Sequence, residues 1–419
     1  MSEPRRYEIR LFDRTLVEFA VSDGLLGPSI ELGDYDDTAS SLMPCGLSLT
    51  PEGIRGWLEL RSIPANRRNA ARICRELGFE LGDLETLYRV SLGLSLNDSY
   101  WVVPRGFDGA FDDFNLYENP FSEAIGALAV SGEAQARRLA GNTPELTTDG
   151  TLRKGWRIIG LKRVLYKGAS DGFDPGEPLS EYLASLVARD LRLNAVAYGL
   201  DEWQGETCST CECFVSKEVS YVPFAVATGI VDLAGALWWV KSLGFEQLES
   251  FCDMLAFDAL VCNTDRHFTN FGVLRDNATG LPVGLAPIFD NGRALFPNVA
   301  EDDAAQFALE AQVKGPAFGG GGFEELVSRV SGPRQRGLMR FAAERGIVGN
   351  VLGPGRRVNA LDSFLRNRGR ELACVPEVDH EALAEALDAA MAKRPLSDDG
   401  TFRLAPGHSE PRCRPGSPR

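Results

Sequence analysis

The order of hydrophobic and polar positions divides the first part of the chain into short strands followed by helices. Residues 7–12 alternate between apolar and polar side chains, and residues 16–21 do so after a turn. From Thr50, a predicted N-cap, the spacing becomes helical. Three helices are predicted: residues 51–58, 66–77 and 83–92. Residues 1–135 are therefore expected to form one accessory domain, mixed α/β and mostly helical.

The rest of the chain separates into a β-rich part and a helical part. Residues 141–175 and 194–225 have strand-like patterns, and residues 178–193 between them carry apolar side chains at helical spacing. The pattern from about residue 231 is helical, apart from a strand-and-loop block at 263–296. The end of the chain is rich in Pro, Gly, Ser and Arg, which favours disorder. The predicted boundaries are 136–230 for the β-rich part, 231–392 for the helical part and 393–419 for the tail.

Composition excludes several classes of protein. The chain has 419 residues, a net charge of −15 and a sequence pI near 4.9, which argues against a chain that binds nucleic acid mainly by charge. No apolar stretch reaches the length of about 18 residues that a membrane span requires. The charged N-terminal sequence does not resemble a signal peptide, so we expect a cytoplasmic protein without a membrane partner.

Cysteine, histidine and lysine counts narrow the chemistry further. Nine Cys without an export signal predict reduced thiols. Cys208, Cys211 and Cys213 lie close together but have no fourth ligand nearby, so free thiols are favoured over zinc. Three His are too few for a His-rich metal site, and the rarity of Lys, seven against 37 Arg, makes each Lys informative.

A run of basic residues in the predicted accessory domain could form a positively charged binding surface or a helix face in contact with water. Five arginines could form one positive helix face: Arg61, Arg67, Arg68, Arg72 and Arg75. Acidic residues interleave with them, at Glu59 and Glu76 among others. Mixed charge of this kind is typical of a helix face in contact with water, and we therefore predict a solvated face.

The block that carries chemistry is Asn-Thr-Asp-Arg-His-Phe-Thr-Asn-Phe-Gly at residues 263–272. Phosphoryl transfer from a nucleotide needs a carboxylate that orients the acceptor hydroxyl, and carboxylate and amide oxygens that hold magnesium. Asp265 and Asn270 have the five-residue spacing of the base and the metal-binding Asn of protein kinases. Asp290, in Phe-Asp-Asn-Gly, occupies the place of the metal-binding Asp. An isolated Asp-x4-Asn would indicate a capped loop, but the second block, in the right order, favours a kinase.

These two blocks, with Ala-Pro-Ile-Phe-Asp-Asn-Gly as the second, resemble the C-lobe signature of HipA-like serine/threonine kinases. The Asp-Arg-His-x-x-Asn core is also similar, more distantly, to the catalytic loop of phosphatidylinositol 3/4-kinases. The resemblance covers residues 90–375 and includes Leu-Ser-Leu-Asn-Asp-Ser-Tyr-Trp at 94–101. It implies an α+β, bilobal protein-kinase-like fold: a small β-rich N-lobe, a mostly helical C-lobe and an N-terminal accessory domain.

The resemblance also implies roles for C-lobe residues. Asp265 matches the catalytic Asp, and Asp290 matches the magnesium-binding Asp. His267 and Asn270 match residues near the phosphates and the metal. ATP and Mg²⁺ are the implied cofactors. The implied reaction is phosphoryl transfer to a protein Ser or Thr.

An N-lobe lysine should bind the nucleotide phosphates and pair with a carboxylate on the following helix. Lys167 ends a predicted strand and Glu181 lies on the next predicted helix, so we pair these two residues. Lys162 is on the same predicted hairpin and remains the competitor. A solvated charge at a strand end is the alternative for Lys167, and the scarcity of Lys argues against it.

The phosphate loop of the family has the pattern Ser/Thr-x-x-Gly-x-x-x-Lys, and its Ser is autophosphorylated in some members. Thr147, Gly150 and Lys154 fit this pattern, with Thr148 as a second hydroxyl. The loop lacks further glycines, and Asp-Gly before Thr151 is also a hairpin signal. Both interpretations can hold, because backbone N–H groups of a hairpin can bind phosphate.

Three functions therefore remain in order of preference. The first is a HipA-like kinase acting on a protein substrate, or on its own Thr147 or Thr148, with an antitoxin-like or DNA-binding partner expected from the family. The second is a small-molecule or lipid kinase, which the shared Asp-Arg-His-x-x-Asn core motivates. The third is a non-catalytic regulator that binds a partner through residues 1–135.

Overall fold

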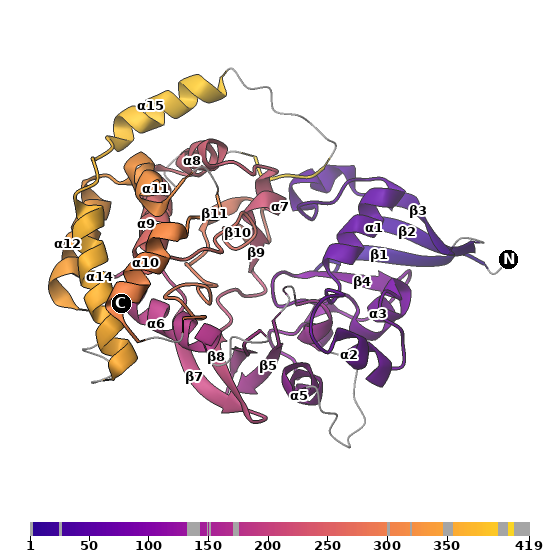
Figure 1. Ribbon diagram of the computed structural model, residues 1–419. Coiled ribbons are helices and arrows are strands. Elements are labelled where there is room, and N and C mark those ends of the chain that lie inside the picture. Colours follow the sequence, from indigo (N-terminus) through magenta and orange to yellow (C-terminus); the bar gives the residue numbers. More distant parts are fainter. Residues whose placement is uncertain are drawn as a thin grey trace, which may run out of the picture.

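The computed structural model describes residues 3–24, 27–131, 143–148, 150, 152–170, 176–299, 302–318, 321–346, 355–392 and 401–405. An accessory domain, a small β-rich lobe and a helical lobe lie side by side (Figure 1). None of the helices among these residues is long and apolar enough to cross a membrane. The chain therefore has the α+β class that its hydrophobic pattern predicts.

The accessory domain is built around an antiparallel sheet in the order β3–β2–β1–β4. Its strands are β1 Arg5–Leu11, β2 Arg14–Gly24, β3 Gly27–Tyr35 and β4 Tyr100–Pro104. Its helical segments are η1 Asp37–Leu42, α1 Pro51–Leu60, α2 Ala70–Glu76, α3 Leu84–Ser91 and α4 Phe111–Phe114. The Thr50 hydroxyl accepts a hydrogen bond from the Gly53 N–H at 3.0 Å, which confirms the predicted N-cap. The helix predicted over 66–77 begins only at Ala70, because Asn69 adopts a left-handed conformation.

The N-lobe contains an antiparallel sheet in the order β5–β6–β8–β7. Its strands are β5 Lys154–Ile159, β6 Lys162–Lys167, β7 Tyr198–Trp203 and β8 Glu206–Glu212. A short helical turn, η2 Pro144–Leu146, precedes β5, and α6 Gly176–Asp190 lies against β7 and β8. The register of β6 places Lys167 opposite Lys154 on one side and opposite Ser209 on the other.

Helix α5, Glu123–Ser131, packs between the accessory domain and the N-lobe. All of its residues from Ile125 to Val130 are buried, so the helix has no solvated face. A Cβ at Gly155 of β5 would lie 2.6 Å from the Gly126 carbonyl oxygen of α5. Only glycine permits the helix and the strand to approach this closely, and the close approach fixes the two domains against each other.

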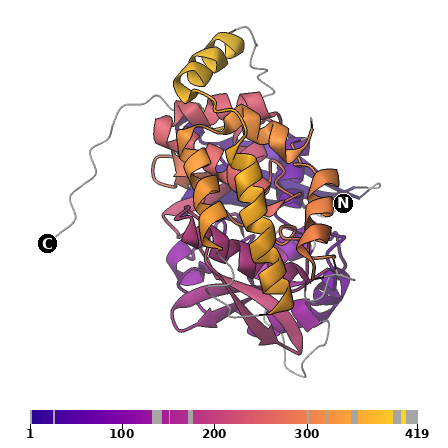
Figure 2. The same cartoon turned by 60° about the vertical axis from the view of Figure 1, so that its left-hand side comes forward.

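The C-lobe combines a three-stranded sheet with helices that surround a large hydrophobic core. Its strands are β9 Val219–Pro223, β10 Gly272–Asp276 and β11 Pro282–Leu285. Its helices are α7 Phe224–Thr228, α8 Leu233–Ser242, α9 Phe245–Val261, α10 Ala304–Val313, α11 Phe323–Val330, α12 Pro333–Arg345, α14 Arg356–Ala373 and α15 His380–Met391. Helix α9 is buried along most of its length, and α14 lies against α12 and α10 (Figure 2).

Residues 213–218 connect the two lobes. Strand β9, inside the segment 136–230 that we assigned to the N-lobe, pairs with β10 of the C-lobe.

Residues 401–405, within the tail expected to be disordered, form a short ordered segment. The Phe402 N–H donates to the Leu47 carbonyl at 2.9 Å, and the Leu404 N–H donates to the Ala227 carbonyl at 2.7 Å. Two side chains hold this segment in place. Phe402 packs against the hydrophobic core of the accessory domain, and Leu404 is buried in the hydrophobic core of the C-lobe. The other tail residues from 393 on lie outside the described residues.

Candidate active site

The two lobes meet at an ionic cluster centred on Lys167, the last residue of β6. Its ammonium lies 2.7 Å from Glu181 Oε1 of α6 and 2.7 Å from Asp290 Oδ1 of the loop after β11. Lys167 and Glu181 are buried, with 5% and 2% of their surfaces exposed, whereas the Asp290 side chain is 32% exposed. One ammonium therefore joins its own strand to the helix that follows it and to a loop 123 residues further along the chain.

The cluster is supported by a hydroxyl on the neighbouring strand. Ser209 Oγ of β8 donates to Glu181 Oε2 at 2.6 Å, so the two carboxylate oxygens of Glu181 each have a partner. Lys162 lies elsewhere: its ammonium is 2.6 Å from the exposed Glu212 carboxylate. The structure thus brings together Lys167, Glu181 and Asp290, and leaves Lys162 on the surface.

Burial and charge set the protonation of the cluster. Burial alone lowers the pKa of Lys167, but the carboxylates of Asp290 and Glu181 outweigh it and raise that pKa well above its ordinary value. Burial raises the pKa of Asp290, yet the ammonium of Lys167, with a smaller contribution from Lys154, holds that pKa far below its usual range. The Lys167–Asp290 pair is therefore fully charged near neutral pH.

The loop after α9 presents Asp265 and Asn270 beside this cluster. Asn270 Nδ2 donates to the Asp265 carbonyl at 2.8 Å and to its Oδ2 at 3.3 Å, so the amide orients the carboxylate. Burial raises the pKa of Asp265, His267 lowers it, and Asp290 raises it again through like charge. His267 is exposed and its Nδ1 is 2.8 Å from the Thr269 hydroxyl.

Arg266 is a residue of this site that the sequence analysis did not single out. It is 1% exposed and forms a two-bond ion pair with Asp258 of α9, with distances of 2.9 and 3.1 Å. Its other donors reach the Asn270 carbonyl at 2.7 Å and Asn291 Oδ1 at 2.6 Å, as well as the Phe289 carbonyl. Arg266 thereby holds the two candidate metal-binding loops against one helix. The sequence offered one signal for this residue: Asp258 lies within the apolar run of α9, eight residues before Arg266, and a buried carboxylate needs a charged partner.

The predicted phosphate loop precedes β5, and Lys154, the first residue of that strand, pairs with Lys167 of β6. Thr147 is buried, and its hydroxyl donates to the Leu94 carbonyl at 2.6 Å. The Thr148 hydroxyl donates to the Pro144 carbonyl at 2.7 Å and accepts from the Trp156 indole at 3.0 Å. Gly150 has a φ of +92°, a conformation that favours glycine. Asp149 and Thr151 lie outside the described residues.

Oxygen donors, and no group of soft ligands, characterise the site. Among the residues that the structure describes, no three His, Cys, Asp or Glu side chains gather as a metal cluster would require. Asp290 and the amide oxygen of Asn270 are hard ligands of the kind Mg²⁺ prefers, and Mg²⁺ bound with substrate phosphates needs only one or two protein ligands. The donor set therefore fits magnesium. Cys208 and Cys211 are buried in β8, and neither forms a disulfide with another described cysteine.

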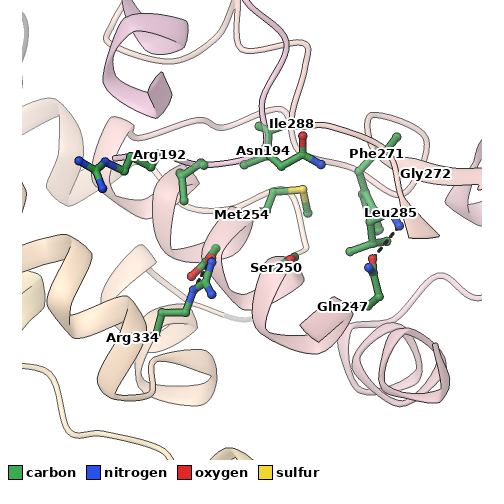
Figure 3. A pocket seen from close by; sticks show the side chains of 13 residues that line it. Arg192, Asn194, Gln247, Ser250, Met254, Phe271, Gly272, Leu285, Ile288 and Arg334 are labelled. Carbon is green, nitrogen blue, oxygen red and sulfur yellow. Dashed lines mark hydrogen bonds and ion pairs between the residues drawn. The ribbon is translucent and has the colours of Figure 1, made fainter. Parts of the chain in front are cut away.

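A separate cavity lies beside helix α9 (Figure 3). It has a volume of about 200 Å³ and is lined by residues of α9, including Gln247 and Met254, and by Phe271 and Ile288. The Gln247 side chain accepts a hydrogen bond from the Leu285 N–H at 2.9 Å across one end of it. Lys167 and Asp290 do not line this cavity, so it is distinct from the ionic cluster.

Comparison with known proteins supports the fold. No family model matches the chain, and no curated protein sequence matches it. The chain is similar to HipA of Shewanella oneidensis MR-1, solved with HipB and its operator DNA, with a TM-score of 0.55 at 14% identity over 90% of this chain and 99% of that one. It is also similar to the Helicobacter pylori proinflammatory kinase CtkA, with a TM-score of 0.41 at 17% identity over 59% of this chain and 94% of that one. The likeness to HipA shows that the chain has a HipA-like kinase fold.

Proposed function

We propose that this protein is an ATP- and Mg²⁺-dependent kinase that phosphorylates a Ser or Thr hydroxyl of a protein. The observation that carries the proposal is the Lys167 ammonium bound at once to Glu181 and Asp290, each at 2.7 Å. Kinases need this lysine–glutamate pair, with a metal-binding aspartate beside it, to hold the nucleotide. The HipA-like fold supports the same conclusion.

Each residue of the cluster has a task in this proposal. Lys167 binds the nucleotide phosphates, and Glu181, fixed by Ser209, keeps the ammonium aimed at them. Asp290 and Asn270 would hold the magnesium ion. When bound, the ion supplies positive charge that offsets the charge developing on the transferred phosphoryl group.

Asp265 orients the acceptor hydroxyl and accepts its proton. Its carboxylate is held by the Asn270 amide, and burial raises its pKa, which makes it a better proton acceptor than an exposed aspartate. Arg266 keeps Asn270 and Asn291 in place from the buried side. The acceptor must therefore approach from the exposed side, where His267 lies.

If the kinase phosphorylates itself, the acceptor is the hydroxyl of Thr147 or of Thr148. Thr147 is 5% exposed and donates to the Leu94 carbonyl, so its phosphorylation requires the segment to leave this position. Thr148 is only partly buried, and we propose it as the acceptor in any autophosphorylation.

The solved HipA is bound to HipB and operator DNA. On that analogy we also propose an antitoxin-like protein partner and a cytoplasmic location for this protein.

The experiment compares two lysines of one strand. Lys167→Met and Lys162→Met remove the same charge from β6, but only Lys167 contacts the candidate site. We expect magnesium-dependent ATP binding, measured by calorimetry, to be lost in Lys167→Met and retained in Lys162→Met.

Incubation with labelled ATP and mass spectrometry then identify any phosphorylated residue, with Asp265→Ala and Asp290→Ala as inactive controls. Equal ATP binding by both lysine variants would refute the site assignment. A wild-type chain that binds no ATP would refute the kinase itself and favour a non-catalytic regulator.

A further inference from the structure

Arg67 of the accessory domain reaches into the N-lobe and binds the segment that leads into the candidate phosphate loop. Its Nε donates to the Gly150 carbonyl at 2.8 Å, one terminal nitrogen donates to the Glu145 carbonyl at 3.2 Å, and the other donates to the Thr148 carbonyl. Arg67 is 3% exposed, so the predicted solvated face is wrong for this residue. Arg61, from the same run, pairs with Asp98, and the two side chains are only 11% and 15% exposed.

These three bonds constrain the backbone of the segment. A guanidinium is planar and its donors point in fixed directions, so it binds three carbonyls only when their peptides have one relative orientation. The segment is also held from within, because the buried Glu145 carboxylate accepts a hydrogen bond from the Trp156 N–H at 2.7 Å. Loss of Arg67 would leave three carbonyls without these donors, that of Glu145 in a buried position, and the segment would no longer be restricted to this conformation.

The opposite side of the loop faces the ionic cluster. A Cβ at Gly150 would lie 2.4 Å from the Lys154 ammonium, so Lys154 lies directly over this glycine. Lys154 pairs with Lys167 in the register of β5 and β6, and its charge helps to lower the pKa of Asp290. A continuous series of contacts therefore runs from Arg67 through Gly150 and Lys154 to the cluster.

We propose that Arg67 is a positioning residue that makes the affinity for nucleotide phosphates depend on the accessory domain. The inference rests on the proposed kinase function. A loop that binds phosphate through backbone N–H groups must have those groups oriented before the ligand arrives, and a disordered loop loses affinity by the free energy of ordering it. Arg67 does not itself touch the nucleotide; it holds the loop that does.

The test separates phosphate binding from nucleoside binding in the full-length chain. The variants are Arg67→Met and Arg67→Lys, and the control is Arg72→Met, which removes an exposed charge from α2. Dissociation constants for ATP with magnesium and for adenosine are measured by calorimetry. We expect Arg67→Met to weaken ATP binding about ten- to a hundredfold, the equivalent of about one hydrogen bond to a charged group. Adenosine binding should be unchanged, and Arg72→Met should bind both ligands like the wild type.

Arg67→Lys keeps the charge and the aliphatic stem but loses the three-way contact, so it should show an intermediate loss of ATP affinity. It also keeps the inference testable if Arg67→Met does not fold, which thermal unfolding will show. Normal ATP affinity in a folded Arg67 variant would overturn the inference while leaving the kinase proposal intact. Equal losses for ATP and adenosine would make Arg67 a general structural residue and also overturn it. If the wild type binds no ATP, both proposals fall together.

Discussion

Replacing Arg266 by Met should destabilise the C-lobe strongly while changing its volume little. The guanidinium and the Asp258 carboxylate are 1% and 2% exposed, so neither charge is screened by water. Methionine fills a similar space but offers no donor, and the change leaves Asp258 as a buried charge without its partner. Removal of one member of such a pair costs about 3–5 kcal/mol.

The hydrogen bonds of Arg266 give an independent estimate. Besides Asp258, the guanidinium donates to the Asn270 and Phe289 carbonyls and to Asn291. Each hydrogen bond to a charged group contributes about 1.5–3 kcal/mol. The sum over these three bonds is therefore larger than the cost of about 3–5 kcal/mol for breaking the Arg266–Asp258 ion pair. Protonation of Asp258, whose pKa burial already raises, relieves part of the loss. We therefore expect a loss of about 3–5 kcal/mol in unfolding free energy, near the figure for the pair.

The measurement is urea unfolding followed by tryptophan fluorescence, with Arg334→Met as the matched control. Arg334 also pairs with a buried aspartate of α9, Asp253, at 2.6 Å, but its own side chain is 57% exposed. An exposed guanidinium contributes at most about 1 kcal/mol to such a pair, so the control should lose little. A double variant, Arg266→Met with Asp258→Leu, should be more stable than the sum of the single changes, because it removes both charges.

Equal destabilisation by Arg266→Met and Arg334→Met would refute this reasoning, because burial would then have no bearing on the strength of the pair. An additive double variant would contradict it as well, since the two charges would not be coupled. Arg266→Lys supplies a further check. It keeps the charge but cannot form the two-bond contact, so its loss should lie between those of the wild type and Arg266→Met.

Three further changes probe the surroundings of the site. Burial raises the pKa of Glu145 to about 7, so the folded chain binds a proton that the unfolded chain has lost, and stability falls as the pH rises from the ordinary glutamate pKa to that value. Glu145→Gln should remove this fall; urea midpoints with the same pH dependence in both proteins would contradict the assignment. Gly155→Ala should lower the free energy of unfolding by about 1–3 kcal/mol, because the added Cβ forces α5 and β5 apart. The control is Gly56→Ala, where the Cβ meets open space; thermal unfolding of both variants should show a loss of stability only for Gly155→Ala. Ser209→Ala removes the 2.6 Å hydrogen bond to Glu181 and should weaken ATP binding, measured by calorimetry; unaltered binding would show that Glu181 needs no such support.

Local features of the site were predictable because they depend on residues close in sequence. The N-cap at Thr50 follows from a hydroxyl one residue before a helical run, and the structure contains it. The Asp265–Asn270 spacing likewise lies within one loop, where the Asn270 amide contacts the carboxylate five residues earlier. Such contacts form wherever the local backbone conformation forms.

The choice between Lys162 and Lys167 shows the limit of that reasoning. The two residues are five apart on one strand, so alternation places their side chains on opposite faces. The sequence therefore indicated that only one of them could face the core. Which face that is depends on α6, which packs over the N-lobe sheet and brings Glu181 to Lys167.

The tertiary structure decided every contact that joins distant segments. The expected helical face of arginines was wrong at Arg67, because that side chain meets Gly150, 83 residues away. The pairing of β4 with β1, and the hydrogen bond from Phe402 to the Leu47 carbonyl, also join segments that are distant in the sequence. Local periodicity reports which side of a strand or helix is apolar, and it carries no information about which distant carbonyl or carboxylate will satisfy a buried charge. That partner is fixed only when the domains pack and water is excluded between them, because a buried charge must then be paired within the protein.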